Sequence, residues 1–196
     1  LWEFGEGKKQ AIAKIIADDE DIQGPHLFRY YNPRPSKVEA AEQAMKDMLG
    51  SKYCLATNSC TSALIACYRA LGIGAGDEVI VPSLTFISTA TALLHVGATP
   101  VFADVRADTL SLDPEDVRGR ITEQTRAVMP VHYGGQAADL KALQSLAEDA
   151  GIVLLEDAAQ AQGRHVGPEV ARDGALTFPV LRMARDAVGP EIAGHV

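Results

Sequence analysis

The sequence has few cysteines, few aromatic residues and no long apolar run. The cysteines, Cys54, Cys60 and Cys67, are odd in number and lack a second cluster or a nearby His pair, so we expect reduced thiols and no bound metal. Apolar runs such as 152–155 are strand-sized, far below the roughly 20 residues of a membrane-spanning helix. Residues 1–14 mix charge with Gly, unlike a signal peptide. These absences together predict a cytoplasmic protein without a membrane segment.

Basic residues are also in the minority. The chain has 18 Lys and Arg against 26 Asp and Glu, a formal net charge of -8, which argues against a nucleic-acid-binding surface. A hydrophobic share of 47% with 22% charged residues is ordinary for a globular protein, and 196 residues suffice for one sizeable core. The composition is therefore that of an ordinary globular protein without a surface for polyanions.

The chain divides by pattern into three parts. Residues 1–35 are predicted to be a helix and an irregular arm, "GPHLFRYYNPRP", and residues 36–175 a large domain. Residues 176–196 match no motif that we can assign, although "LRMARDAVGPEIAGHV" has a helical pattern up to its Gly-Pro. A capping-box pattern from Ser36 to Glu39 and apolar residues on one helical face predict a helix over 37–49.

From Tyr53 onward, short apolar runs alternate with helical stretches. This alternation predicts a three-layer α/β/α fold with a mostly parallel sheet, whose ligands bind beyond the carboxyl ends of the strands. Asp113 before Pro114 is a typical helix start. Helices are expected from about residues 61, 86 and 137, and a short one from Pro114 within "SLDPEDV". The predicted strands are "YCLAT", "EVIVP", "TPVFADV", "RAVMPVH" and "IVLLED".

Two of the predicted strands lead into residues that could bind a cofactor. After "YCLAT", the stretch "TNSCTSAL" opens a helix with small and hydroxylic residues, where backbone N–H groups and the Thr61 hydroxyl can hold a phosphate. Simple Ser/Thr capping is the alternative. "PSLTFIST" brings Phe86 to the same edge of the sheet, although a Phe at a helix start is more often part of the core.

Two further strand ends carry ionisable residues. "PVHYGG" places His132 before a Gly-Gly turn, either near a substrate or as a satisfied buried imidazole. In "LLEDAAQAQG", alternation directs Glu156 and Asp157 to opposite sides of the sheet. A buried carboxylate needs a partner. The candidates for Asp157 are a structural Arg, a helix N-terminus, or a cofactor with a protonatable ring nitrogen.

These strand ends, in this order, resemble the DegT/DnrJ/EryC1/StrS family of pyridoxal-phosphate sugar aminotransferases, a branch of fold type I. The resemblance covers about residues 27–167. It implies the large domain of such an enzyme, apparently incomplete, because the chain has about half the expected length and lacks the C-terminal small domain. The stretches that carry it are "SCTSAL", "GDEVIVPSLTFISTATALLHVGATPVFADV", "ITEQTRAVMPVHYGG" and "LLEDAAQAQG".

The resemblance implies roles for individual residues. Cys60 and Thr61 match the phosphate loop, Phe86 the aromatic that stacks on the pyridine ring, Asp157 the carboxylate that pairs with the pyridinium nitrogen, and Gln160 a contact to the cofactor face. A close carboxylate keeps the ring nitrogen protonated, which the electron sink requires. The arm resembles a segment that shapes the substrate pocket, in several members across a dimer interface. It makes Phe28, Arg29 and Tyr30 candidates for substrate binding, with packing under the first helix as the alternative.

The family's Schiff-base lysine has no counterpart in this sequence. It is expected about two dozen residues after Asp157, but the last lysine is Lys141. Aligning the expected segment on Thr177 and Phe178 puts Ala184 near the lysine position. The sequence can be a fragment or a join across missing residues, a truncated homologue that binds cofactor or partner without transaminating, or a divergent member with other chemistry.

The resemblance implies a pyridoxal-phosphate aminotransferase that moves an amino group from Glu or Gln to a keto sugar, a nucleotide-linked keto sugar or a cyclitol ketone. It also implies a homodimer. Antibiotic and cell-surface sugar biosynthesis are both compatible with it. The rival interpretation is a lysine-lacking relative of fold type I that serves as a binding or regulatory subunit.

Overall fold

A computed structural model of the chain describes residues 37–49, 53–161 and 181–183. The chain divides into two compact units, Leu1–Met45 and Lys46–Val196. The helix predicted over 37–49 is confirmed as α2, Lys37–Leu49, whereas the helix predicted within residues 1–35 lies outside the described residues. Glu39 in its first turn and Lys46 in its last turn complement the helix dipole. No helix in the described ranges is long and apolar enough to cross a membrane.

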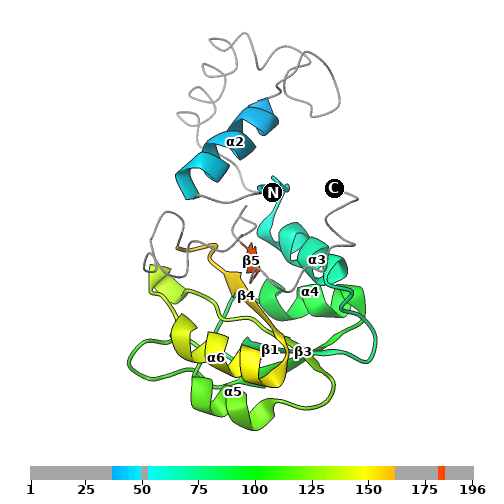
Figure 1. Cartoon of the computed structure of the whole chain (residues 1–196), viewed down its shortest axis with the longest axis vertical. Coiled ribbons are helices and arrows are strands. Elements are labelled where there is room, and N and C mark those ends of the chain that lie inside the picture. Colours follow the sequence, from blue (N-terminus) through cyan, green and yellow to red (C-terminus); the bar gives the residue numbers. More distant parts are fainter. Residues whose placement is uncertain (1–36, 50–52, 162–180, 184–196) are drawn as a thin grey trace, which may run out of the picture. The chain divides into compact units, whose positions relative to one another are not determined.

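The second unit is built on a five-stranded sheet in the order β2-β1-β3-β4-β5 (Figure 1). The first four strands are parallel and β5 runs antiparallel to β4. The chain steps from β1 to β2 on one side and then returns to β3 on the other. The carboxyl ends of β1 and β3 therefore flank a topological switch point, where sheets of this kind bind ligands. The strands are β1 Glu78–Pro82, β2 Thr99–Ala103, β3 Thr125–Val128, β4 Val153–Asp157 and β5 Leu181–Met183.

Helices cover both faces of the sheet, which confirms the predicted three-layer α/β/α fold (Figure 1). One apolar core joins α3 and α4 to strand residues such as Val81 and Leu155. The other joins α5 and α6 to the alternate residues, such as Ile80 and Leu154. Strand alternation thus assigns each side chain to one layer. The helices are α3 Cys60–Ala70, α4 Ser88–Val96, α5 Pro114–Arg120 and α6 Leu140–Ala150, with a short 3₁₀ turn, η2, at Tyr133–Gly135.

The helix boundaries follow local chemistry. Asp113 caps α5 by accepting a bond from the Glu115 N–H, with Pro114 in the first turn as predicted. The side chain of Asp139 accepts from the Ala142 N–H, so α6 begins three residues later than predicted. Gly151 ends α6 with φ of 66°, a left-handed conformation that favours Gly.

Two predictions of secondary structure are wrong. "YCLAT", residues 53–57, is not a strand, and Tyr53 and Leu55 are about half exposed. A β-prone run becomes a strand only if it pairs with a neighbour, and no strand in the described part of the chain pairs with this one. Conversely, Leu181–Met183 is the strand β5 where the pattern predicted a helix. It pairs with Leu155–Asp157 of β4, a long-range contact that overrides local propensity.

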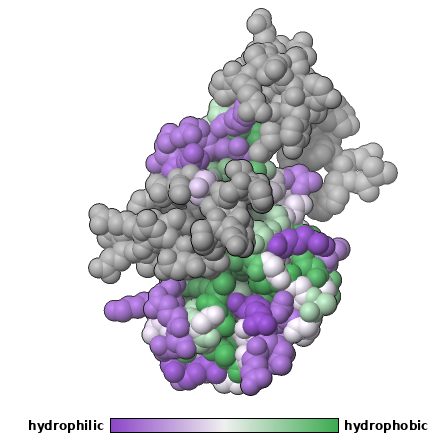
Figure 2. Space-filling model, turned by 45° about the vertical axis from the view of Figure 1, so that its right-hand side comes forward, coloured by the Kyte–Doolittle hydropathy of each residue, from purple (hydrophilic) through white to green (hydrophobic). Residues whose placement is uncertain are grey.

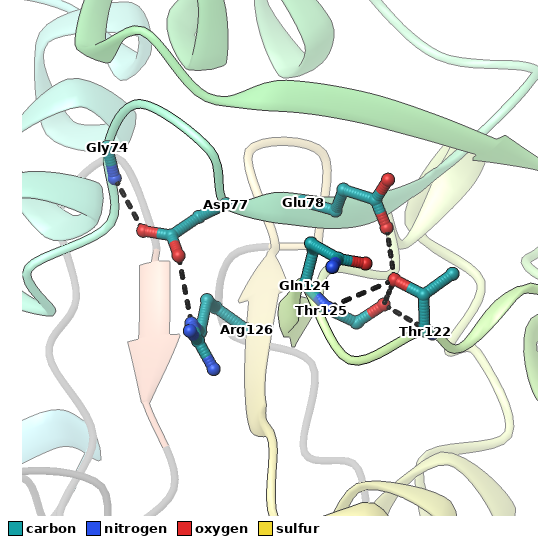
Figure 3. Close-up of polar contacts among 7 residues, drawn as sticks. All are labelled: Gly74, Asp77, Glu78, Thr122, Gln124, Thr125 and Arg126. Atoms are coloured by element: carbon teal, nitrogen blue, oxygen red, sulfur yellow. Dashed lines mark hydrogen bonds and ion pairs between the residues drawn. The ribbon is translucent and has the colours of Figure 1, made fainter.

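The amino ends of β1 and β3 are fastened by polar contacts (Figure 3). The Asp77 carboxylate accepts the Gly74 N–H at 3.0 Å and the Arg126 Nε at 2.9 Å. These bonds, that of Gly74 first, hold the pKa of Asp77 below its ordinary value. Beside it, the Thr122 hydroxyl donates to Glu78 at 2.5 Å. All of these groups lie at the edge of the sheet opposite the predicted site. We therefore infer that their role is to fix the register of β1 against β3.

Both polar and apolar side chains reach the surface, as Figure 2 shows for one face. Among the described residues, the most exposed large apolar side chains are Phe86 at 72% and Ile87 at 69%. They lie in the loop between β1 and α4, at the carboxyl edge of the sheet. Two adjacent apolar side chains this exposed at a ligand-binding edge are unusual for a loop that is only structural.

Ser111 gives a stability prediction. It is 2% exposed, and its hydroxyl is the one side-chain N or O atom of the described residues that is buried without a hydrogen-bond partner. Because an unsatisfied buried hydroxyl is costly, Ser111→Ala should raise the free energy of unfolding by about 1 kcal/mol. Urea denaturation measures this. Ser145→Ala, on the exposed surface of α6, is the control and should change little. A destabilised Ser111→Ala protein would contradict the expectation.

Candidate cofactor site

Asp157 lies at the end of β4, where the carboxyl edge of the sheet meets the first turns of α3 and α4. It is 5% exposed. Its backbone is fixed on both sides, since its N–H donates to Pro130 O and its carbonyl accepts the His132 N–H, both at 3.0 Å. The carboxylate is therefore held at a defined place inside the protein.

Three donors surround the Asp157 carboxylate. Oδ1 accepts the Ala159 N–H at 3.1 Å and lies 3.9 Å from the Cys60 Sγ. Oδ2 lies 3.5 Å from the Thr89 hydroxyl. All three donors are uncharged, and the two side-chain contacts are long. In the part of the chain that the structure describes, no Lys or Arg pairs with Asp157, so the structural arginine considered from the sequence is not found there.

Burial raises the pKa of Asp157 above its ordinary value. The Ala159 N–H and the hydroxyl and thiol donors act in the opposite direction but do not cancel the desolvation. An ionised carboxylate at this place is costly without a cation, and a ligand that carries a positive charge would relieve the cost. The site therefore suits a cationic group.

The start of α3 lies beside Asp157. Ser59 caps the helix and accepts the Ser62 N–H, so the capping interpretation of "TNSCTSAL" is correct for Ser59. The Cys60 side chain faces Asp157, and the Thr61 hydroxyl donates to Ser88 Oγ at 2.8 Å. Burial and the neighbouring Asp157 raise the pKa of Cys60 to about 11, so it is a protonated thiol at neutral pH. The amides of Cys60 and Thr61 lie in the first turn, where helices bind anions.

The loop before α4 carries Phe86 to the same edge. Phe86 is 72% exposed, so the alternative of a core residue is wrong. Its carbonyl accepts the Thr89 N–H at 3.0 Å, and the Thr85 and Thr89 hydroxyls are 2.7 Å apart. The aromatic ring thus stands on a loop that is hydrogen-bonded to the helix behind it.

Glu156 faces the opposite layer, as the alternation predicts. Its Oε2 lies 3.1 Å from His132 Nε2, and the Ala138 N–H donates to His132 Nδ1 at 3.2 Å. Because Nδ1 accepts, Nε2 carries the proton and donates to Glu156. His132 is 2% exposed. Its placement matches the alternative of a satisfied buried imidazole, and its role near a substrate stays a prediction.

Gln160 lies on the turn after β4. Its side-chain oxygen accepts the Gly134 N–H at 2.7 Å, so the turn after β4 is tied to the Gly-Gly turn after β3. Gly135 has φ of 80°, and a Cβ there would lie 3.0 Å from the Gln160 carbonyl oxygen. This close approach explains why the turn needs Gly. Gln160 is exposed beyond Asp157.

The structure thus brings Cys60, Thr61 and Asp157 together with the loop of Phe86, and it places Gln160 on the turn that follows. Phe28, Arg29 and Tyr30 lie outside the described residues. Sequence reasoning missed Thr85 and Thr89. Their i, i+4 spacing in "TFIST" was the available signal, since it places both on one side of a helix start.

Fold and site together define a class. The chain is an α/β protein of three layers with a buried acid, a helix start suited to an anion and an exposed aromatic ring at the carboxyl edge of a parallel sheet. A family model described as the DegT/DnrJ/EryC1/StrS aminotransferase family matches residues 32–175. The chain belongs to this family, as the sequence motifs indicated.

Individual relatives support this family assignment. The chain is similar to the spore coat polysaccharide biosynthesis protein SpsC of Bacillus subtilis (strain 168), with 48% identity over 125 residues, 64% of this chain and 32% of SpsC. Among solved structures, DesV of S. venezuelae has 34% identity and a TM-score of 0.74, covering 95% of this chain and 53% of DesV.

Two further solved structures confirm the fold type I architecture. 3-Amino-5-hydroxybenzoic acid synthase has 32% identity and a TM-score of 0.66, covering 89% of this chain and 44% of the synthase. NtdA of Bacillus subtilis, solved with the bound cofactor PMP, has 26% identity and a TM-score of 0.73, and the match covers 97% of this chain and 44% of NtdA. The chain spans about half of these solved chains, or less, and about a third of SpsC.

Proposed function

We propose that this chain is the cofactor-binding part of a pyridoxal-phosphate-dependent aminotransferase. Its substrate is a keto sugar, a nucleotide-linked keto sugar or a cyclitol ketone, and glutamate or glutamine donates the amino group. The observation that carries the proposal is the Asp157 carboxylate, which is buried at a ligand-binding edge and has only uncharged donors around it in the described part. The family membership supports the aminotransferase activity, and the similarity to SpsC, a spore coat polysaccharide biosynthesis protein, supports a sugar substrate.

The residues fit pyridoxal phosphate by chemical type. Asp157 would hold the protonated ring nitrogen, and the amides of Cys60 and Thr61, with the Thr61 hydroxyl, would bind the phosphate. Phe86 would stack on the ring, and Gln160 would contact its face. When bound, the cofactor supplies an electron sink for bond cleavage at the amine carbon. These assignments, a homodimer and a cytoplasmic location are part of the proposal.

The direct test uses the full-length protein and pyridoxamine phosphate, the amine form of the cofactor. This form needs no Schiff-base lysine, so calorimetric titration examines the site alone. We expect saturable binding with a dissociation constant in the micromolar range or below, weakened by competing inorganic phosphate. Failure to bind either cofactor form at millimolar concentration would refute the proposed site.

Phe86 gives a second expected result. Phe86→Ala should weaken binding of pyridoxamine phosphate by about tenfold, since it removes a stacking surface, while Phe86→Tyr should bind nearly as wild type. Because Phe86 is 72% exposed, the substitution should leave the thermal midpoint of the cofactor-free protein unchanged. Ile87→Ala, at an equally exposed neighbour, is the control, and equal losses from both variants would count against stacking.

A second function, cofactor binding without transamination, is favoured by one observation. The last lysine of the sequence is Lys141, which is exposed on α6, in the layer opposite the Asp157 side chain. Borohydride reduction of the full-length protein with pyridoxal phosphate, followed by peptide mass spectrometry, separates the two. A cofactor fixed to a lysine and glutamate-dependent formation of pyridoxamine phosphate support the aminotransferase. Binding without either supports the non-catalytic relative.

A further inference from the structure

Thr89 is a buried polar residue that the proposed cofactor assignments do not use. It lies in the first turn of α4 and is 1% exposed. Its hydroxyl has two neighbours, Asp157 Oδ2 at 3.5 Å and Thr85 Oγ1 at 2.7 Å. A hydroxyl buried at this depth needs partners, and here both partners lie at the edge of the sheet that carries the site.

The direction of the two bonds follows from the chemistry of the acceptor. An ionised carboxylate has no proton to donate, so the Thr89 hydroxyl donates to Asp157. Thr89 has only one hydroxyl proton, and its contact with Thr85 must therefore be one in which Thr85 donates. The result is a directed chain from Thr85 through Thr89 to the carboxylate.

The hydroxyl chain from Thr85 through Thr89 donates to Oδ2, the carboxylate oxygen that the other two donors do not contact. Cys60 and the Ala159 N–H both approach Oδ1, whereas Thr89 approaches Oδ2. Donors on both oxygens restrict rotation of the carboxylate about its Cβ–Cγ bond. They also offset part of the desolvation without adding a charge, so the carboxylate keeps its net negative charge for a cation.

The same hydroxyl pair controls the loop of the aromatic ring. Thr85 directly precedes Phe86, and the Thr89 N–H donates to the Phe86 carbonyl at 3.0 Å. Movement of this loop away from α4 would break the Thr85–Thr89 contact and disturb the donor to Asp157. The carboxylate and the ring are thereby tied together through two threonines.

We propose that Thr89 is a positioning residue for Asp157. In this proposal the Thr85–Thr89 hydroxyl pair holds the carboxylate and the Phe86 loop in the relative positions that allow both to contact one flat cationic ring. This inference rests on the proposed function. Thr89 touches no cofactor in it, and its effect is exerted through Asp157.

The test compares two ligands of the full-length protein, pyridoxamine phosphate and its 1-deaza analogue, in which carbon replaces the ring nitrogen. The ratio of their dissociation constants isolates the interaction of Asp157 with the ring nitrogen. We expect Thr89→Val, which keeps the shape and removes the hydroxyl, to reduce this ratio about fivefold, the effect of one modest hydrogen bond to a charged group. Thr89→Ser should restore it, and Thr85→Val should lower it by a smaller factor.

Thr91→Val on the same helix is the matched control and should leave the ratio unchanged. If Thr89→Val weakens both ligands equally, Thr89 has only a structural role and the inference is wrong. An unchanged ratio overturns it as well. Failure of the proposed function is seen separately, because the wild-type protein would then bind neither ligand or show no preference for the ring nitrogen.

Discussion

Asp157→Asn should make the cofactor-free protein more stable at neutral pH and weaken its binding of pyridoxamine phosphate by at least about 100-fold. The amide keeps the shape of the side chain and removes a buried charge that no described Lys or Arg offsets. We expect the thermal midpoint of the cofactor-free protein to rise by a few degrees, about 2–4 °C per kcal/mol for a chain of this size. Calorimetry measures both effects, and transamination should fall by orders of magnitude.

The pH dependence of the stability gain has a defined sign. Burial raises the folded-state pKa of Asp157 above its ordinary value of 3.8, so the protonated form is favoured by folding. The wild-type protein therefore loses stability as pH rises from the ordinary value through the raised one. The Asn variant does not titrate, and its advantage should vanish at acidic pH and be complete above the raised pKa.

Asp149→Asn, at an exposed acid on α6, is the control and should show no such pH-dependent gain. If Asp157→Asn destabilises the cofactor-free protein at neutral pH, the carboxylate contributes to folding and the charge-burial argument is wrong. If the variant binds pyridoxamine phosphate as tightly as wild type, Asp157 is not the partner of the ring nitrogen.

His132→Leu should destabilise the protein by about 3 kcal/mol, one of the largest effects expected of a single substitution here. It removes the Nε2 donor from Glu156, a carboxylate that is 6% exposed, and the Nδ1 acceptor from the Ala138 N–H. Urea denaturation measures the loss. Because the imidazole belongs to the layer of α5 and α6, the protein that remains folded should still bind pyridoxamine phosphate.

A double-mutant cycle separates the pair from simple packing. Glu156→Leu combined with His132→Leu should cost less than the sum of the single substitutions, with a coupling of about 2 kcal/mol. Gln144→Ala, which removes a solvent-exposed bond to Glu148 on α6, is the surface control and should cost no more than about 0.5 kcal/mol. Strict additivity would show that the 3.1 Å contact contributes little. A large loss of cofactor binding would instead support the substrate-side role first considered for His132.

Sequence reasoning predicted correctly the features that depend on local chemistry or on the spacing of apolar residues along a helix or strand. The α2 boundaries, the Asp113 cap and the strands 78–82 and 153–157 follow from patterns within a few residues of each element. The opposite orientations of Glu156 and Asp157 follow from the two-residue period of a strand. The family followed from the order of the strand-end motifs, and residues 32–175 match its model.

The failures were at places where a distant partner decides. "YCLAT" has the composition of a strand but pairs with no described neighbour, and 181–183 is a strand because β4 offers it backbone partners. His132 could not be assigned from "PVHYGG", because its two bonds go to Glu156 and to the Ala138 N–H. Thr89 was overlooked because its carboxylate partner is 68 residues away.

The sequence by itself determined the elements, the strand-end residue types and the family, since each depends on short-range spacing or on ordered motifs. Only the tertiary structure decided which of those residues share a site. Burial gives the Asp157 carboxylate its need for a cation, and burial depends on the packing of α3, α4 and β4 around it. Desolvation is a property of the assembled layers, and no local pattern of residues carries it.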